Sequence, residues 1–283
     1  MSEEKSSPFD FRGKTVFVAG GTSGINLGIA QGFASAGARL AVLSRSHDKV
    51  DAAVDSLEAL GVEAMGFAAD VRDYAAVESA LAEVHQKWGD IDVLISGAAG
   101  NFPVPALGMS ANAFHTVVDI DLQGSFHVLR SAFQYLRKPG ASVINISAPQ
   151  AFLPMALQAH VCAAKAGVDM LTRVLALLGR GSEAAMAAEA TVKACQELHA
   201  TDTEPAAHAL KWGSAGVRVN SICPGPIDHT EGMRRLAPSE AIRESVIKSV
   251  PMQCMGEVQD IADAAMFLSC PQARYISGVI LPV

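Results

Sequence analysis

The chain reads TVFVAGGTSGINLG from Thr15 to Gly28, an apolar run that passes through glycines into a helical pattern. Residues 15–19 are rich in β-branched side chains and predict a buried strand, and residues 25–36 predict a helix. A glycine-rich turn at such a junction lets backbone amides approach a pyrophosphate at the helix N-terminus. We therefore predict a nucleotide site, with a plain structural turn as the alternative; its expected contacts are Gly20, Thr22, Ser23, Gly24 and Ile25.

Outside this stretch, strand-like and helix-like runs alternate to the end of the chain. Further strands are predicted at residues 39–43, 62–68, 91–95, 142–146, 217–222 and 275–281. Helices are predicted at residues 48–60, 74–88, 160–178 and 258–269, and over most of 111–137. Continuously apolar strands that alternate with helices indicate a parallel sheet covered on both faces, and right-handed crossovers make it doubly wound. The expected fold is α/β, a Rossmann-type sheet in a single domain over residues 1–283.

One stretch, residues 178–212, interrupts this alternation before the strand at 217–222. A connection between a helix and a strand usually needs about 2–6 residues. Residues 182–199 are rich in Ala and Glu, and a turn sequence follows at 201–205, so we predict an inserted helical hairpin. A surface hairpin without chemistry is the simplest interpretation, and an altered oligomer interface or a docking element is the alternative.

The net charge, the apolar runs and the cysteines indicate which partners and which cellular compartment to expect. The 283 residues carry a net charge of −7, which argues against nucleic acid and anionic membrane surfaces as partners. No apolar run is long enough to span a membrane, and the polar residues 1–8 are not a signal peptide. The five cysteines are scattered without a CxxC pair, which predicts reduced thiols in a cytoplasmic protein and no metal site.

The ends of the next strands indicate which nucleotide the fold would hold. An NAD site places a carboxylate after the second strand, but here Ser44 and Arg45 stand there. The guanidinium of Arg45 can pair with a 2′-phosphate, which favours NADP(H); an exposed arginine at a strand end is the alternative. Asp70 and Val71 follow the third strand, where they would contact the adenine ring. Small residues that would allow close approach to a ribose follow the fourth strand: Ala98, Ala99 and Gly100.

Several ordered motifs make the chain resemble the short-chain dehydrogenase/reductase family over residues 12 to 283, the inserted stretch excepted. They are the glycine-rich turn, Asp70-Val71, Ala98-Ala99-Gly100, Ser147, Lys165, Val217-Arg-Val-Asn220 and Pro224-Gly-Pro-Ile227. Within the family, residues 98–102, 119–121, 225–227 and 230–232 and His160 are similar to the 2,4-dienoyl-CoA reductases, most of all the peroxisomal kind.

This resemblance implies roles for particular residues. Lys165 would bind the nicotinamide ribose, and the loop that carries Pro224, Gly225 and Ile227 would contact the cofactor. The resemblance also implies a homodimer or homotetramer, packed through the helices at 111–137 and 160–178.

The sequence departs from the family pattern at the position of the catalytic tyrosine. The family carries tyrosine four residues before the lysine, but this chain has Val161, which cannot donate a proton. Gln150 stands where mitochondrial dienoyl-CoA reductases carry another tyrosine, and Asn26 replaces the third glycine of the turn, where its tolerance of unusual backbone angles suits it. The three tyrosines of this chain fall elsewhere in the topology and are expected to be structural: Tyr74, Tyr135 and Tyr275.

A conjugated dienoyl thioester suits a site without that tyrosine, because hydride added at the far end of the diene sends charge to the thioester oxygen. Asp121 stands where the family has an asparagine that holds a water, so its carboxylate could pair with Lys165 and relay protons. Ser147 could donate a hydrogen bond to a substrate oxygen. The alternatives for these three residues are a helix-kink residue, a solvated lysine and an ordinary strand-end hydroxyl. The residues expected to line the substrate pocket are Asn101 as an oxyanion donor, Phe102, Gln150 and His160.

The leading interpretation is an NADPH-dependent reductase of 2,4-dienoyl-CoA or a related enoyl thioester. A broad carbonyl or 3-oxoacyl reductase is a second interpretation, which Val161 argues against. A catalytically weak NADP-binding scaffold is a third, which the missing tyrosine and the inserted stretch both favour.

Overall fold

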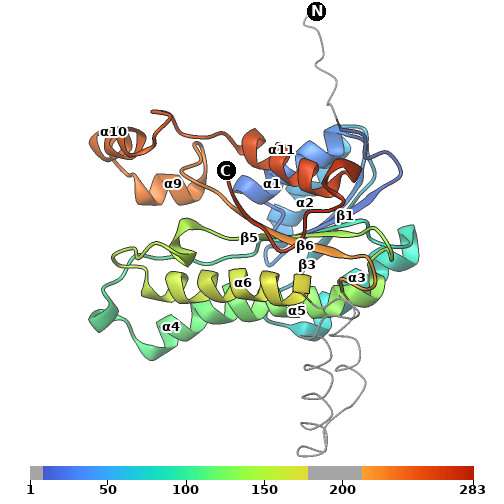
Figure 1. Cartoon of the computed structure of the whole chain (residues 1–283), viewed down its shortest axis with the longest axis horizontal. Helices are drawn as coiled ribbons and strands as arrows, with labels where there is room; N and C mark the ends of the chain where they lie inside the picture. Colours follow the sequence, from blue (N-terminus) through green and yellow to red (C-terminus); the bar gives the residue numbers. More distant parts are fainter. Residues whose placement is uncertain (1–8, 178–211) are drawn as a thin grey trace, which may run out of the picture.

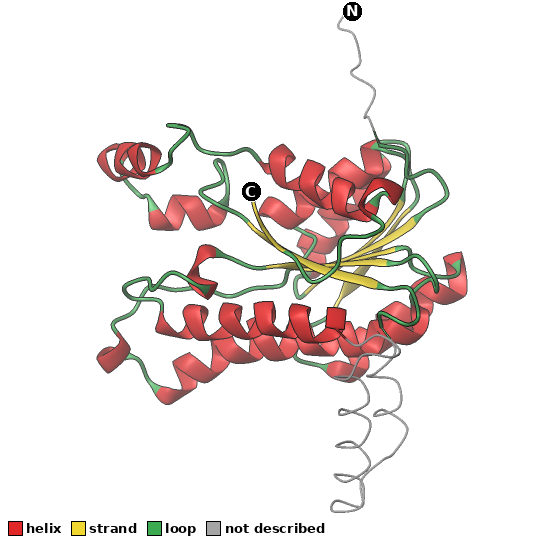
Figure 2. Ribbon diagram, viewed as in Figure 1, coloured by secondary structure: helices red, strands yellow, loops and turns green. Residues whose placement is uncertain are grey.

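A parallel sheet of seven strands forms the centre of the computed structural model, which describes residues 9–177 and 212–283 (Figure 2). Its strand order is β3-β2-β1-β4-β5-β6-β7 and every pair is parallel, so the prediction of a doubly wound α/β sheet is confirmed. The strands are β1 (Thr15–Ala19), β2 (Arg39–Ser44), β3 (Ala64–Ala68), β4 (Val93–Ser96), β5 (Ser142–Ile146), β6 (Arg218–Cys223) and β7 (Ile280–Pro282).

Helices cover both faces of this sheet (Figure 1). One face carries α1 (Gly24–Ser35), α2 (His47–Glu58) and α11 (Val258–Ser269). The other face carries α3 (Tyr74–Trp88), α4 (Ala111–Val118), α5 (Gly124–Ala132) and α6 (Ala159–Leu177). Two short helices, α9 (Glu231–Leu236) and α10 (Glu240–Ser249), follow β6 and contain no buried residue. The helix predicted over 111–137 is not uniform, because a π-helical segment at Asp119–Gln123 separates α4 from α5.

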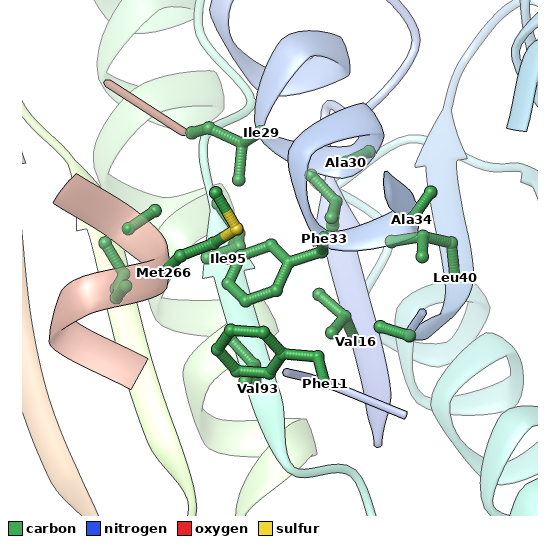
Figure 3. Packing of buried hydrophobic residues seen from close by; sticks show 14 of the residues in the cluster. Phe11, Val16, Ile29, Ala30, Phe33, Ala34, Leu40, Val93, Ile95 and Met266 are labelled. Atoms are coloured by element: carbon green, nitrogen blue, oxygen red, sulfur yellow. The ribbon is translucent and has the colours of Figure 1, made fainter. Parts of the chain in front are cut away.

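The alternation of side chains along β1 builds two separate cores. Val16 and Val18 face α1 and α11, whereas Phe17 and Ala19 belong to the core under α3 and α5. Figure 3 shows the first core, in which Phe33 of α1 lies among strand residues and Met266 of α11. Because both cores use β1, the strand is fully buried and its carboxyl end is fixed in place.

The contact between α1 and α11 is close because glycines face the partner helix. A Cβ added to Gly28 would lie 1.8 Å from Cγ1 of Val258, and one added to Gly32 would lie 2.9 Å from Cβ of Ala262. These glycines therefore set how near α11 lies to α1, and α1 begins at the glycine-rich turn.

Some predicted boundaries differ from the structure. The strand predicted at 275–281 is only Ile280–Pro282, since the fully exposed Tyr275 lies in a loop after a short 3₁₀ helix. The inserted hairpin predicted at 178–212 lies outside the described residues apart from Trp212, which is buried and packs 4.9 Å from the ring of Phe133.

Within the part of the chain that the structure describes, no helix is both long and apolar enough to cross a membrane. Over the same residues, no group of three or more His, Cys, Asp or Glu side chains is placed to hold a metal ion.

Candidate active site

A cavity of about 310 Å³ lies at the carboxyl ends of β1, β2, β3 and β4. Ligands of doubly wound sheets bind in a crevice at this edge. Nine of the residues predicted to bind a cofactor line it: Gly20, Thr22, Ser23, Ser44, Arg45, Asp70, Val71, Ala98 and Ala99. Four segments that were predicted separately to bind the cofactor therefore meet at one cavity.

The other predicted cofactor residues lie outside the lining of this cavity. Gly24 and Ile25 form the first turn of α1. The backbone N–H of Gly100 donates to Oδ1 of Asp121. The remaining ones come from α6 and from the loop after β6: Lys165, Pro224, Gly225 and Ile227.

Glycine is required at the start of the turn because β4 passes close to it. Gly20 has a φ of 80°, and a Cβ there would lie 2.8 Å from backbone atoms of Ala98. The turn and the end of β4 thus form one tightly packed wall, which fits the close approach of a pyrophosphate.

Asn26 also lines the cavity, and sequence reasoning did not give it a contact. It lies within α1 with helical backbone, and its Nδ2 donates to the carbonyl oxygen of Gly97 at 2.7 Å. A Cβ on Gly97 would come within 2.3 Å of the same amide group. Asn26 therefore joins the glycine-rich turn to the end of β4.

Two cations, Arg45 and Lys49, line the part of the cavity beyond β2. Lys49 was not predicted, although its place in the first turn of a helix directly after Arg45 is a signal that could have revealed it. Asp70 faces the same cavity but forms an ion pair with Arg72 at 2.6 Å, and the hydrogen bond from Arg72 lowers the pKa of the Asp70 carboxyl. The donor set of the cavity fits an anionic nicotinamide dinucleotide.

The predicted pairing of Asp121 with Lys165 is confirmed. Nζ of Lys165 lies 3.4 Å from Oδ2 of Asp121, and both side chains are at least nine-tenths buried. Nζ also donates to the carbonyl oxygen of Ile146 at 3.0 Å, which fixes the ammonium at the end of β5. The other carboxylate oxygen of Asp121 accepts the N–H of Gly100 at 2.7 Å. The ion pair therefore connects α6, β5 and the loop after β4.

Asp121 is placed by the π-helical segment between α4 and α5. Such segments widen a helix by one residue and are frequent at functional sites. Burial raises the pKa of the Asp121 carboxyl, and Lys165 and the N–H of Gly100 act in the opposite direction. The carboxyl is thus held in a site where its proton can be exchanged nearer to neutral pH than that of an exposed aspartate.

Five buried polar atoms near this ion pair have no hydrogen-bond partner among the described residues. They are Oδ2 of Asp121, whose contact with Lys165 is the ion pair at 3.4 Å, Oγ of Ser147, Oε1 of Gln150 and both ring nitrogens of His160. Leaving a buried polar group unpaired costs about 1–3 kcal/mol, so a cluster of such groups indicates a ligand or an ordered water that pairs with them. These atoms therefore mark a polar binding region beside Lys165.

Gln158, which sequence reasoning missed, ties together two of the predicted substrate residues. Its Oε1 accepts a hydrogen bond from Nδ2 of Asn101 at 3.2 Å and another from Nε2 of Gln150 at 2.9 Å. The ring of Phe102 lies 4.6 Å from the ring of His160. The four predicted substrate residues are thus brought together, from the loop after β4, the segment after β5 and the start of α6.

The chain's tyrosines are engaged elsewhere or exposed. Tyr74 packs edge-on against His127, and Tyr135 packs against His85. Tyr275 lies fully exposed in the loop before β7. Val161 is buried in the position expected for the family's tyrosine, one helical turn before Lys165.

Comparison with known proteins is consistent with this geometry. A family model described as short chain dehydrogenase matches residues 14–191, and one described as Enoyl-(Acyl carrier protein) reductase matches residues 199–283. The chain belongs to the short-chain dehydrogenase family. It is therefore an oxidoreductase of the type that uses NAD(H) or NADP(H).

The curated relatives indicate which members of the family this chain is similar to. It is 36% identical to a peroxisomal 2,4-dienoyl-CoA reductase of Arabidopsis thaliana, over 98% of this chain and 86% of the relative. It is 32% identical to the corresponding protein of Saccharomyces cerevisiae, over 100% of this chain and 87% of the relative. Among solved structures, a short chain dehydrogenase from Bacillus anthracis has a TM-score of 0.79 and 29% identity, covering 96% of each chain.

Proposed function

We propose that the protein is an NADPH-dependent reductase of 2,4-dienoyl-CoA, or of a closely related enoyl thioester. The observation that carries this proposal is the buried Lys165–Asp121 pair in a chain with valine at position 161. An ordinary ketone needs a proton donor for the oxygen that receives the charge. A conjugated thioester instead takes its proton on carbon, which a water can deliver. The relatives named 2,4-dienoyl-CoA reductases support this assignment.

The cofactor proposed for the cavity is NADP(H). Arg45 and Lys49 would hold the 2′-phosphate, and Lys165 would bind the nicotinamide ribose. When bound, NADPH supplies the hydride. The other proposed contacts are the backbone and small side chains of Gly20, Thr22, Ser23, Gly24, Ile25, Ser44, Asp70, Val71, Ala98, Ala99, Gly100, Pro224, Gly225 and Ile227.

In the proposed reaction, hydride is added at C5 of the dienoyl group, and the double bonds shift toward the thioester. The resulting enolate takes a proton at C2, which leaves a 3-enoyl thioester. Asp121, whose Oδ2 lies 3.4 Å from Nζ of Lys165, would pass that proton through a water, while Lys165 stabilises the carboxylate. Ser147 would donate its hydroxyl hydrogen to the thioester oxygen.

The substrate wall is proposed to consist of Asn101, Phe102, Gln150 and His160. Asn101 donates one of its two amide hydrogens to Gln158, which holds it in this wall and leaves the other for the proposed oxyanion contact. The amide network it forms holds the loop after β4 against the start of α6.

A homodimer or homotetramer is proposed, packed through the helices on one face of the sheet. Large apolar side chains are exposed on α5 and α6: Phe126, Met170, Val174 and Leu177. A monomer rarely exposes so many on adjacent helices. Light scattering after size-exclusion chromatography would give a mass of two or four chains, and a monomer mass would refute this proposal.

We also propose a reducing compartment, the cytoplasm, for a chain whose cysteines at 162, 223, 254 and 270 are free. Several relatives are named as peroxisomal, so a fluorescent fusion in the source cells has to distinguish these two locations.

The experiment that tests the function is NADPH oxidation with three substrates: a 2,4-dienoyl-CoA, a 3-oxoacyl-CoA and a simple ketone, with NADH as the cofactor control. Turnover of the dienoyl thioester alone supports the proposal. Turnover of the ketone or the 3-oxoacyl thioester would favour the broad carbonyl reductase. NADPH binding without any turnover would favour the scaffold.

A further inference from the structure

His160 is a fully buried histidine, and neither of its ring nitrogens has a hydrogen-bond partner in the described parts of the chain, residues 9–177 and 212–283. A neutral imidazole has one N–H donor and one nitrogen acceptor, so both capacities are left unused. A structural histidine in a core normally satisfies at least one of them. His160 therefore requires a partner that the described residues do not supply.

The chemistry of the unpaired atoms indicates what that partner is. Among the five, the groups able to donate are the ring N–H of His160 and the hydroxyl of Ser147. A single oxygen acceptor placed between them would satisfy both. A thioester carbonyl oxygen is such an acceptor, and it takes on negative charge as the diene is reduced.

The elements that carry the two donors meet beside the ion pair. Ser147 directly follows Ile146, whose carbonyl oxygen accepts from Lys165. His160 lies on the first turn of α6, five residues before Lys165, which is about 7.5 Å along the helix axis. His160 also lies near enough to Asp121 that a charge on its ring would lower the pKa of that carboxyl.

Position 161 explains why a second donor is needed. Val161 is buried beside His160 on the same helix and offers no polar hydrogen. If His160 did not donate, Ser147 would be the only donor among these five atoms to the oxygen that becomes negatively charged. One donor in such a site is worth roughly 10²–10³ in turnover.

We propose that His160 donates its ring N–H to the carbonyl oxygen of the bound acyl thioester and forms an oxyanion hole with Ser147. This inference rests on the proposed function, because it names how that substrate is held. His160 transfers no proton in this role and only stabilises the enolate oxygen. The exposed ring of Phe102 lies 4.6 Å from the imidazole of His160.

The test compares His160→Leu with His160→Gln. Leucine removes the donor, so kcat with a 2,4-dienoyl-CoA should fall about 10²–10³-fold, with KM changed far less and NADPH affinity unchanged. Glutamine restores an N–H at a similar reach and should recover part of kcat. A kcat for His160→Leu within about threefold of the parent would overturn the proposal, and so would a glutamine variant as inactive as the leucine variant.

A matched control separates catalysis from folding. Thr172 is a buried polar residue on the same helix, and its hydroxyl is paired with Asn145 and with the carbonyl of Val168. Thr172→Val should lower the melting temperature without lowering kcat. If it lowers kcat as much as His160→Leu does, the effect at His160 is structural and the proposal fails.

A spectroscopic readout does not depend on turnover. With NADP⁺ present, a bound 2,4-dienoyl-CoA should show its near-ultraviolet band shifted to longer wavelength, because its carbonyl accepts hydrogen bonds. His160→Leu should bind the thioester with a smaller shift, and an unchanged shift would overturn the role of His160. A parent protein that neither binds nor reduces the thioester would instead refute the proposed function itself.

Discussion

Replacing Lys165 by methionine should make the stability of the protein depend more strongly on pH. The substitution keeps an unbranched side chain but removes the ammonium 3.4 Å from the buried Asp121. The carboxylate then has no cationic partner, although the N–H of Gly100 still donates to it. A buried carboxylate in this position takes up a proton rather than remain charged, so its pKa rises further in the variant.

The size of the effect follows from proton linkage. Each pH unit above the ordinary aspartate pKa of about 3.9 costs at most about 1.4 kcal/mol for a group that must be protonated to fold. The largest loss of folding free energy expected for Lys165→Met is therefore about 4 kcal/mol at pH 7 and about 1.5 kcal/mol at pH 5. Because the folded pKa of Asp121 is raised, the stabilising proton is bound at low pH and is lost as the pH rises through that pKa.

Urea unfolding followed by circular dichroism at pH 5, 6 and 7 measures this difference between Lys165→Met and the parent. The deficit of the variant should grow with pH, and adding Asp121→Asn should abolish that growth. Equal deficits at all three pH values would refute the account of the pair, as would a pH dependence that survives the second substitution. Turnover should be abolished in both variants.

Three further predictions concern the cofactor cavity, the packing of α1 and a buried thiol. Arg45→Ala should weaken NADPH binding about 10–100-fold in fluorescence titrations and change NADH binding far less, because a charge-assisted hydrogen bond contributes about 1.5–3 kcal/mol; equal losses would contradict the 2′-phosphate role. Gly28→Ala places a Cβ 1.8 Å from Val258 and should cost about 1–3 kcal/mol in thermal unfolding. Val258→Ala should recover part of this loss, and Gly232→Ala, which has open space, should cost little. Burial raises the pKa of Cys223 to about 11, so alkylation at pH 8, read by peptide mass spectrometry, should spare it until urea is added; rapid labelling of the native protein would show that the thiol is accessible.

The sequence predicts best what depends on neighbouring residues. β1 has the predicted bounds, and the turn after it lines the cavity, because a strand, a glycine turn and a helix start leave a local pattern. The pairing of Asp121 with Lys165 was predicted because the resemblance places Asp121 where the family has an asparagine that holds a water next to the lysine.

Contacts between distant segments were not predicted. Asn26 reaches Gly97 across 71 positions, and Gln158 reaches Asn101 across 57, so no local pattern announces either contact. The unpaired nitrogens of His160 depend on how α6 packs against neighbouring segments, which the sequence does not give. Side-chain partners across a doubly wound sheet are thus set by packing, even where the elements themselves are evident.

The most direct test of a tyrosine-independent dienoyl-CoA reduction is the isotopic analysis of its product. A 2,4-dienoyl-CoA would be reduced with NADPH deuterated on the nicotinamide, and separately with ordinary NADPH in deuterium oxide, and the products examined by mass spectrometry and NMR. The account predicts a 3-enoyl thioester with one deuterium at C5 in the first experiment and one at C2 in the second. Failure to form a reduced thioester, or cofactor deuterium at any carbon other than C5, would contradict it.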